Sequence, residues 1–136
     1  MATKVNIHAT VAAPREKVWA CYTEPEHITK WNFAADDWQC PSASNDMRVG
    51  GKYTARMEAK DGSFGFDFEA IYNAIDPGNS FTYTIPDGRV VDVVFSDNGS
   101  NTDVAITFDA ESVNPVELQQ AGWQSILNNF KEYTEG

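Results

Sequence analysis

The sequence predicts an α+β fold with a curved antiparallel sheet of about six or seven strands wrapped around a long C-terminal helix. Two short helices are expected after the first strand. Three observations lead to this prediction. Several segments alternate apolar and polar residues, as half-buried antiparallel strands do. Two proline-marked helix starts follow the first such segment, and the C-terminal segment carries apolar residues at three- and four-residue steps.

The N-terminal part of the chain predicts one strand and two short helices. Residues 5–11 alternate apolar and polar side chains, which indicates a half-buried strand. Pro14 then suits the first turn of a helix, where its missing N–H removes no hydrogen bond. Thr23 and Glu26 have the spacing of a capping box, with a proline just inside it. They predict a second helix that ends near Lys30.

The middle of the chain predicts a meander of strands. Residues 31–49 are irregular apart from a short strand over residues 38–40, and Gly50-Gly51 forms a turn. The later segments alternate with a period of two and are separated by turns rich in Asp, Asn and Gly. These strands are expected at residues 52–59, 64–72, 81–85, 91–95 and 104–108.

The C-terminal segment predicts the helix that covers the sheet. Asn114 is a favourable N-cap, Pro115 suits the first helical position, and Glu117 stands where a capping-box carboxylate belongs. A helix that continues to about Tyr133 is roughly 28 Å long, enough to lie along the whole sheet. Its apolar stripe is Val116, Trp123, Ile126, Leu127, Phe130 and Tyr133.

Composition and charge exclude several classes of protein. The formal net charge of -10 argues against nucleic acid and against an anionic membrane surface as partners. The 42% apolar and 12% aromatic content is too high for a disordered chain. We expect one domain over residues 1–136, located in the cytoplasm, because no signal peptide or membrane span is evident. Cys21 and Cys40 are expected to be reduced, buried thiols.

Many aromatic side chains fall on the predicted inner face of the sheet or on the helix stripe that covers it. Two interpretations stay open, because these rings form a solid core or border a cavity. Trp31 and Trp38 lie in the irregular segment, which is expected to be a lid over the cavity mouth or a hydrophobic cap. The inward-facing rings are Tyr53, Phe64, Phe66, Phe68, Phe81, Tyr83, Phe95, Phe108, Trp123 and Phe130.

The polar candidates point to no catalytic constellation, cofactor or metal site. Arg89 begins a strand on the predicted inner face and would hold a carboxylate there, or else it pairs with Asp87 or Asp76. His27 lies near the proposed mouth without a recognisable cluster of metal-ligating residues. His8 is expected to face solvent, as are Asp67 and Glu69 on the wet face of the sheet.

Specific motifs in the chain resemble a known family. They are Ala13-Pro14-x-Glu16-Lys17-Val18-Trp19, Thr23-Glu24-Pro25-Glu26-His27-Ile28-x-Lys30-Trp31, Asp46-x-Arg48-x-Gly50-Gly51, Asp87-Gly88-Arg89 and Glu117-x-Gln119-Gln120-x-Gly122-Trp123-x-x-Ile126-Leu127-x-Asn129-Phe130. They are similar to the START-like, or SRPBCC, superfamily, in its branch of homologues of the activator of the ninety-kilodalton heat-shock-protein ATPase. The resemblance implies a helix-grip fold with a cavity between sheet and helix. It also implies relatives that carry lipids, sterols or hormones, or that cyclise polyketides.

Three functions therefore remain open. The first is non-catalytic binding of a small hydrophobic or amphipathic molecule in a cavity of roughly 300 Å³ or more. The second is a protein-interaction module that modulates a heat-shock chaperone ATPase, and the third is a cyclase- or dehydratase-like enzyme. No cofactor is expected, and the protein is a monomer or a homodimer. The candidate cavity residues are Trp31, Trp38, Tyr53, Met57, Phe66, Phe68, Phe81, Tyr83, Arg89, Val91, Phe108, Trp123 and Leu127.

Overall fold

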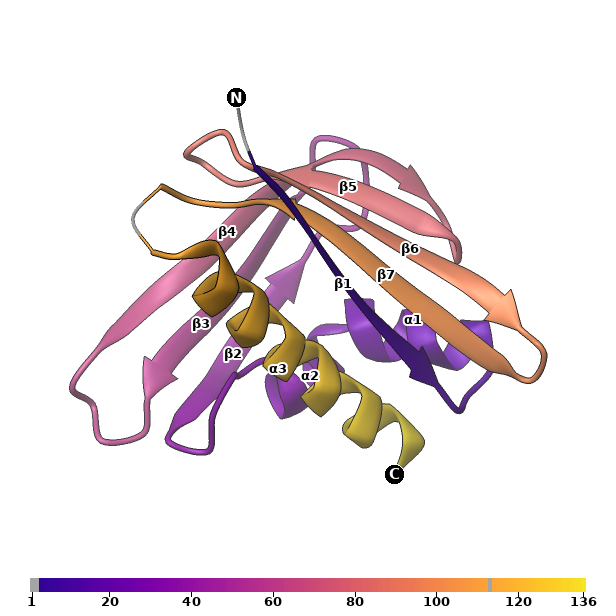
Figure 1. Cartoon of the computed structure of the whole chain (residues 1–136), viewed down its shortest axis with the longest axis horizontal. Coiled ribbons are helices and arrows are strands. Elements are labelled where there is room, and N and C mark those ends of the chain that lie inside the picture. The colour runs from indigo at the N-terminus through magenta and orange to yellow at the C-terminus, as the bar shows by residue number, and fades with distance from the viewer. Residues whose placement is uncertain (1–2, 113) are drawn as a thin grey trace.

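The computed structural model describes residues 3–112 and 114–136, which form one antiparallel sheet and three helices (Figure 1). Seven strands pair in the order β1-β7-β6-β5-β4-β3-β2. The strands are β1 (Lys4–Val11), β2 (Trp38–Asn45), β3 (Lys52–Ala59), β4 (Gly65–Asp76), β5 (Ser80–Thr84), β6 (Val90–Asn98) and β7 (Asn101–Asp109). The helices are α1 (Arg15–Thr23), α2 (Pro25–Trp31) and α3 (Val116–Glu135). This is the predicted fold class.

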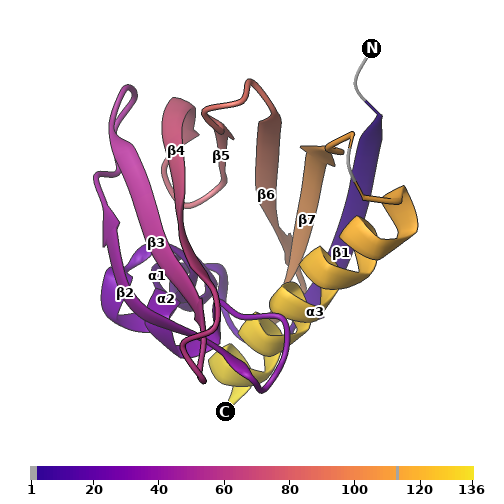
Figure 2. The ribbon, with the colours of Figure 1, turned by 90° about the vertical axis from the view of Figure 1, so that its left-hand side faces the viewer.

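The sheet is curled into a half-barrel, and the helices lie within its concave side (Figure 2). The long helix α3 packs along β1 and also contacts α1 and α2. The two short helices sit at one end of the concavity, where α2 packs against β2 and α1 reaches β6 and β7. The interior is therefore covered by three helices at one end and by the first half of α3 at the other. None of the described helices combines the length and apolarity that a membrane span requires.

Alternation of side chains decides which face of each strand is buried. Along β1 and β7, every second residue is buried against the helices while its neighbours face outward. On the outer face of β3 and β4, Lys52 lies 3.3 Å from Glu69 and Arg56 lies 3.4 Å from Asp67. Asp67 and Glu69 thus lie on the solvated face, as predicted.

Two predicted helix caps are wrong. The Thr23 hydroxyl donates to the carbonyl of Trp19 in the preceding turn, at 2.8 Å, so it does not cap α2. Glu24 is the N-cap of α2 and makes no side-chain capping bond. At α3 the N-cap residue is Pro115, because the Asn114 side chain instead donates to the Glu111 carboxylate. In both places the side chain donates to a nearby oxygen and does not accept a hydrogen bond from the N–H groups of the helix terminus.

The segment predicted to be irregular is only partly so, because residues 38–45 form a regular strand while residues 32–37 and 46–49 lie outside helices and strands. Trp31 is the last residue of α2 and is only 3% exposed, with its indole N–H donating to the Cys21 carbonyl at 2.9 Å. Trp38 opens β2, an eight-residue edge strand that pairs with β3 and has a register shift between Gln39 and Ser42. The segment therefore closes one edge of the sheet.

Candidate functional site

A cavity of about 180 Å³ lies between the sheet and α3. It is smaller than the roughly 300 Å³ that the sequence led us to expect. The concave side of the half-barrel is thus partly filled and partly hollow, which joins the two alternatives left open by the sequence. The lining residues are Tyr22, Trp31, Asn32, Tyr53, Met57, Phe66, Phe68, Tyr83, Ile106, Trp123, Ile126 and Leu127.

The structure brings eight of the candidate residues to this cavity and places the others elsewhere. Those at the cavity are Trp31, Tyr53, Met57, Phe66, Phe68, Tyr83, Trp123 and Leu127. Phe81 and Val91 are buried in the core behind Tyr83 and do not themselves line the cavity. Phe108 lies behind Trp123, with the two rings stacked at a centroid distance of 4.0 Å. Trp38 lies outside the lining, and Arg89 is turned away from it.

Arg89 is a clear correction. Arg89 lies directly before β6. Its guanidinium Nε lies 2.7 Å from Asp87 Oδ2, and its Nη1 lies 4.0 Å from Glu111 Oε2. The alternative in which Arg89 pairs with Asp87 is therefore correct, and Asp76 takes no part among the ion pairs of the described residues. A guanidinium so close to two carboxylates has its charge compensated, which an apolar cavity would not do.

Four lining residues were not among the candidates. Tyr22 comes from α1, Asn32 follows α2, Ile106 comes from β7 and Ile126 from α3. Ile126 was on the predicted helix stripe, so the periodicity contained the signal for it. Tyr22 and Asn32 reach the cavity because α1 and α2 fold back into the concave side, which a single sequence does not reveal.

The polar groups of the lining gather at the end near α1 and α2. Asn32 Nδ2 donates to the Tyr53 hydroxyl at 3.2 Å, and both residues are buried. Behind them, the Tyr72 hydroxyl donates to Asn45 Oδ1 at 2.7 Å. Burial raises the pKa of Tyr53 and of Tyr83 well above the ordinary tyrosine value. Burial also raises the pKa of Tyr22, so all three lining hydroxyls stay protonated at neutral pH.

The opposite end of the cavity is apolar and opens near the hairpin between β3 and β4. Phe66 lines the cavity yet is 42% exposed, which marks this end as the mouth. Trp38, Phe64 and Phe66 form an aromatic rim there, with ring centroids 6.0 to 6.3 Å apart. Phe64 itself is 60% exposed, so its predicted inward orientation is wrong. The reason is that β4 begins at Gly65, and alternation does not extend into the turn.

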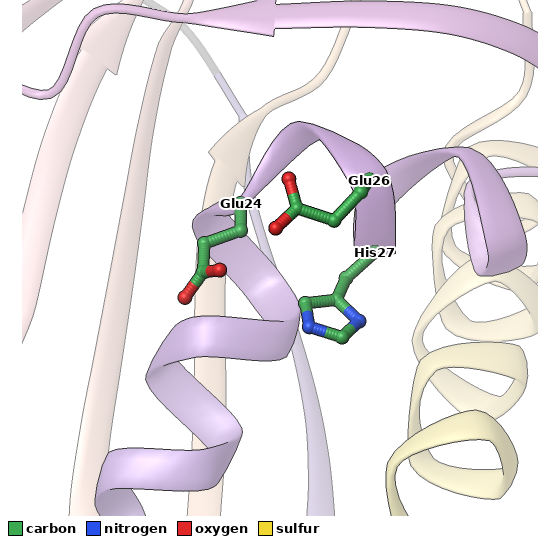
Figure 3. A group of neighbouring side chains, drawn as sticks. All are labelled: Glu24, Glu26 and His27. Carbon is green, nitrogen blue, oxygen red and sulfur yellow. The ribbon is translucent and has the colours of Figure 1, made fainter.

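A second group of polar residues lies outside the cavity (Figure 3). Glu24, Glu26 and His27 each offer one ligand atom, and these atoms lie within 4.8 Å of one another. The expectation of no such cluster around His27 is therefore wrong. The other side of the ring is held by Tyr133, whose hydroxyl shares a hydrogen bond of 2.6 Å with Nδ1.

The surroundings of this cluster account for its carboxylates without an ion. Glu24 and Glu26 are exposed at the start of the seven-residue helix α2, where negative charge interacts favourably with the helix dipole. The pKa of Glu26 is below its ordinary value, chiefly because its carboxylate accepts a hydrogen bond from its own backbone N–H.

Both cysteines are free and buried, as predicted, and burial raises the pKa of the Cys40 thiol to about 11.

Comparison with known proteins gives the family. The sequence profile of the family described as Activator of Hsp90 ATPase homolog 1-like protein matches residues 12–135. The solution structure of the AHSA1-like protein from Aeromonas hydrophila is 41% identical and superposes with a TM-score of 0.92, covering 98% of this chain and 92% of that one. The protein Chr148 from Cytophaga hutchinsonii is 48% identical, with a TM-score of 0.84 over 97% of this chain and 92% of that chain.

A more distant protein shows how far the fold persists. CV1439 from Chromobacterium violaceum is only 23% identical, yet it superposes with a TM-score of 0.87 and covers 98% of this chain and 97% of that one. No curated protein sequence matches the chain. The profile match spans nearly the whole sequence, and the half-barrel, the two short helices and α3 are shared with the solved structures. The chain therefore belongs to the family of Activator of Hsp90 ATPase homolog 1-like proteins.

Proposed function

We propose that the protein binds a small, mostly apolar molecule in the cavity between the sheet and α3, as a carrier or sensor that does no chemistry on it. The observation that carries this proposal is the cavity itself, about 180 Å³ in volume and walled by aromatic and aliphatic side chains. An engineered cavity of about 150 Å³ with an apolar lining is large enough to take up benzene. The space between sheet and helix thus suits a ligand built on one ring.

The lining favours binding over catalysis. Among the described residues that wall the cavity, the tyrosines are the only ionisable groups. General acid–base catalysis works best with a pKa near the working pH. Burial moves the pKa of Tyr53 and Tyr83 further above neutrality, which makes their hydroxyls poorer acids. A cyclase- or dehydratase-like reaction therefore has less support than simple binding.

Modulation of a chaperone ATPase rests on the family description alone. The aromatic rim of Trp38, Phe64 and Phe66 is an exposed apolar feature, but its rings also frame the cavity mouth. The ligand-binding proposal accounts for both the rim and the cavity, so we give it precedence.

The test is a titration with toluene, followed by amide chemical shifts in protein NMR spectra. We expect saturable shifts that centre on Tyr22, Tyr83 and Trp123, because these residues line the cavity. Native mass spectrometry of the freshly purified protein adds a search for a bound molecule from the host. Absence of any saturable shift up to the solubility of toluene would contradict the proposal.

A matched pair of variants locates the binding. Ile126→Trp puts a larger side chain into the lining, whereas Leu118→Trp makes the same kind of change on the same helix at a residue that is 61% exposed and outside the lining. We expect toluene affinity to fall about tenfold or more in Ile126→Trp, since filling the cavity removes the space for the ligand. It should stay within about twofold in Leu118→Trp, where the surface change touches nothing in the cavity. Equal effects of the two substitutions would place the binding elsewhere.

A further inference from the structure

We propose that the ligand of this cavity is an electrically neutral molecule of about one ring whose acceptor oxygen is bound by the hydroxyls of Tyr22 and Tyr83. This inference rests on the proposed function and adds to it the chemical class of the ligand and its orientation. Three observations support it. Two hydroxyls of the lining lack a hydrogen-bond partner among the described residues, and no charged side chain lies in the described lining. The polar groups also gather at one end of the cavity.

Two lining hydroxyls have no hydrogen-bond partner among the residues that the structure describes. Tyr53 and Tyr72 are held by Asn32 and Asn45, respectively. The Tyr83 side chain, by contrast, is only 4% exposed, and neither it nor Tyr22 hydrogen bonds with any group in residues 3–112 and 114–136. Tyr22 is half-buried and Tyr83 is buried, and hydroxyls in such places normally find a partner, so two unpaired ones in a cavity wall point to a ligand acceptor.

These hydroxyls retain access to open space. Across residues 3–112 and 114–136, the fully enclosed side-chain atoms without a hydrogen-bond partner are Thr134 Oγ1 and Asp109 Oδ1, the latter ion-paired with Lys4 at 2.5 Å. The hydroxyls of Tyr22 and Tyr83 are not of this kind, although both rings pack within the interior. Since both residues line the cavity, we infer that the open space that their hydroxyls reach is the cavity itself. A hydroxyl donates one hydrogen bond, which an ether, carbonyl or hydroxyl oxygen of a ligand would accept.

The lining offers no partner for a charged ligand. Of the described side chains that form the wall, none is an Asp, Glu, Lys, Arg or His. Arg89, the guanidinium that the sequence predicted on the inner face, is bound to Asp87 at 2.7 Å and does not line the cavity. A carboxylate that entered this cavity would lose its hydration without a counter-charge, and the protein's net charge of -10 adds repulsion. The cavity therefore selects against anions.

Aromatic walls attract cations through the faces of the rings, so a cation could bind here without an anionic side chain. Trp123 is the largest ring in the mouth half of the wall, and one of its faces is covered by Phe108, with an interplanar angle of 12°. The hydroxyls of Tyr22 and Tyr83 would have to turn their hydrogens away from a cation. A neutral acceptor uses both the ring surface and the O–H groups, so it fits this wall better.

Polarity is sorted along the cavity, and this gives the ligand a direction. The strand register pairs Tyr83 with Tyr72 at the end near α1 and α2, whereas Met57 pairs with Phe66 at the hairpin end. The tyrosine end is deep, since Tyr53 is 5% exposed, while Phe66 at the mouth is 42% exposed. The oxygen of the ligand therefore enters first, and its apolar part lies between Phe68 and Trp123.

Four probes of nearly equal size test the inference: ethylbenzene, acetophenone, benzoate and 1-phenylethylammonium. We expect acetophenone to bind the wild-type protein about fivefold more tightly than ethylbenzene, which is the range of one net hydrogen bond. Benzoate and the ammonium probe should each bind at least about tenfold more weakly than acetophenone. Binding of either ion as tight as that of acetophenone would overturn the inference while leaving the proposed function standing. If none of the four probes binds, the proposed function fails, and the inference fails with it.

A pair of tyrosine variants tests the named hydroxyl. In Tyr83→Phe the ratio of acetophenone affinity to ethylbenzene affinity should fall about threefold or more, because the ligand oxygen loses a donor. Tyr72→Phe is the matched control, since Tyr72 is a buried tyrosine on the paired strand whose hydroxyl already binds Asn45 and which does not line the cavity. There the ratio should stay within about twofold, as no donor to the ligand is removed. An unchanged ratio in Tyr83→Phe, or an equal fall in both variants, would contradict the assigned role of Tyr83.

Discussion

At the end of the concave side that α1 and α2 cover, the rings of Tyr22, Trp31, Phe81, Phe95 and Phe130 form an aromatic core cluster. Their contacting ring centroids lie 5.0 to 6.2 Å apart, mostly edge to face or tilted. At the other end, Phe66, Phe68 and Trp123 belong to the same residue types but border a cavity of about 180 Å³. Aromatic residues thus form a filled region and a hollow one in a single concavity, and Tyr22 and Trp31 lie on the border of the two.

The difference between the two ends comes from what covers them. The core cluster receives side chains from α1, α2, α3 and two strands, so rings approach one another from several directions. Near the mouth, the first half of α3 is the covering helix (Figure 2). One face of the Trp123 ring is stacked against Phe108. Where a single helix covers a strongly curved sheet, the side chains from the two sides of the sheet do not reach each other. The number of covering elements therefore decides between core and cavity, and ring content does not.

The largest expected effect is on folding stability at the filled end. Phe130→Ala should lower the free energy of unfolding by about 3–5 kcal/mol, because a fully buried ring is lost from a packed cluster. Phe68→Ala should lower it by only about 1–2 kcal/mol, since Phe68 is partly buried and already faces open space. Denaturant unfolding of both variants measures the two values. Equal losses would mean that the mouth half is as tightly packed as the core cluster, and the comparison would fail.

The next effect is on stability at high pH, and it concerns the tyrosines on the border of the two regions. Burial holds the pKa of Tyr83 well above the value of about 10 that it has when unfolded. Below pH 10 both states carry the proton; above it the unfolded state loses its proton first, so stability falls as pH rises. Each such tyrosine contributes a slope of about 1.4 kcal/mol per pH unit in this range.

Variants separate this contribution from other alkaline titrations. Tyr83→Phe should unfold with a shallower dependence on pH above about pH 10, because one proton difference between the two states is removed. Burial raises the pKa of Tyr133 as well, but less than that of Tyr83, so the slope of Tyr133→Phe should resemble that of the wild type more closely. Denaturant titrations at several values between about pH 9 and pH 11.5 provide the slopes. Identical slopes in Tyr83→Phe and the wild type would show that the cavity hydroxyls are well solvated.

Within regular strands and the long helix, the sequence was sufficient to predict the fold. Residues 52–59 were expected as a strand and are β3, and the C-terminal stripe lies on α3 as predicted. Alternation works there because each side chain has one of two faces to choose. It failed at Phe64, which lies just before the strand, and at β2, whose sequence contains Pro41 and lacks a clear alternation. An edge strand tolerates such a proline because its missing N–H needs no partner there.

The cavity was harder to predict than the fold. Periodicity placed Met57, Phe68 and Leu127 on the inner side, and these residues do line the cavity. It also placed Phe81 and Val91 there, which lie in the solid core instead. Met57 and Phe68 share a face of the sheet with Phe81 and Val91, so their separation depends on how α1 and α2 fold back over one end. That packing is a tertiary property, which local spacing does not contain.

The smallest expected effect is a gain in stability from Gly122→Ala in the first half of α3. Gly122 has no positive φ and sits inside the helix, where glycine is less favourable than alanine by about 0.5–1 kcal/mol. A Cβ added at this residue would meet no atom within 4 Å among the residues that the structure describes, so nothing there opposes the substitution. The free energy of unfolding should therefore rise by about 0.5–1 kcal/mol. Gly51→Ala is the matched contrast, because its Cβ would lie 2.1 Å from the Asp46 carbonyl oxygen and should be destabilising. Loss of stability in Gly122→Ala would mean that the first half of α3 packs more closely over the sheet than the hollow end of this comparison allows.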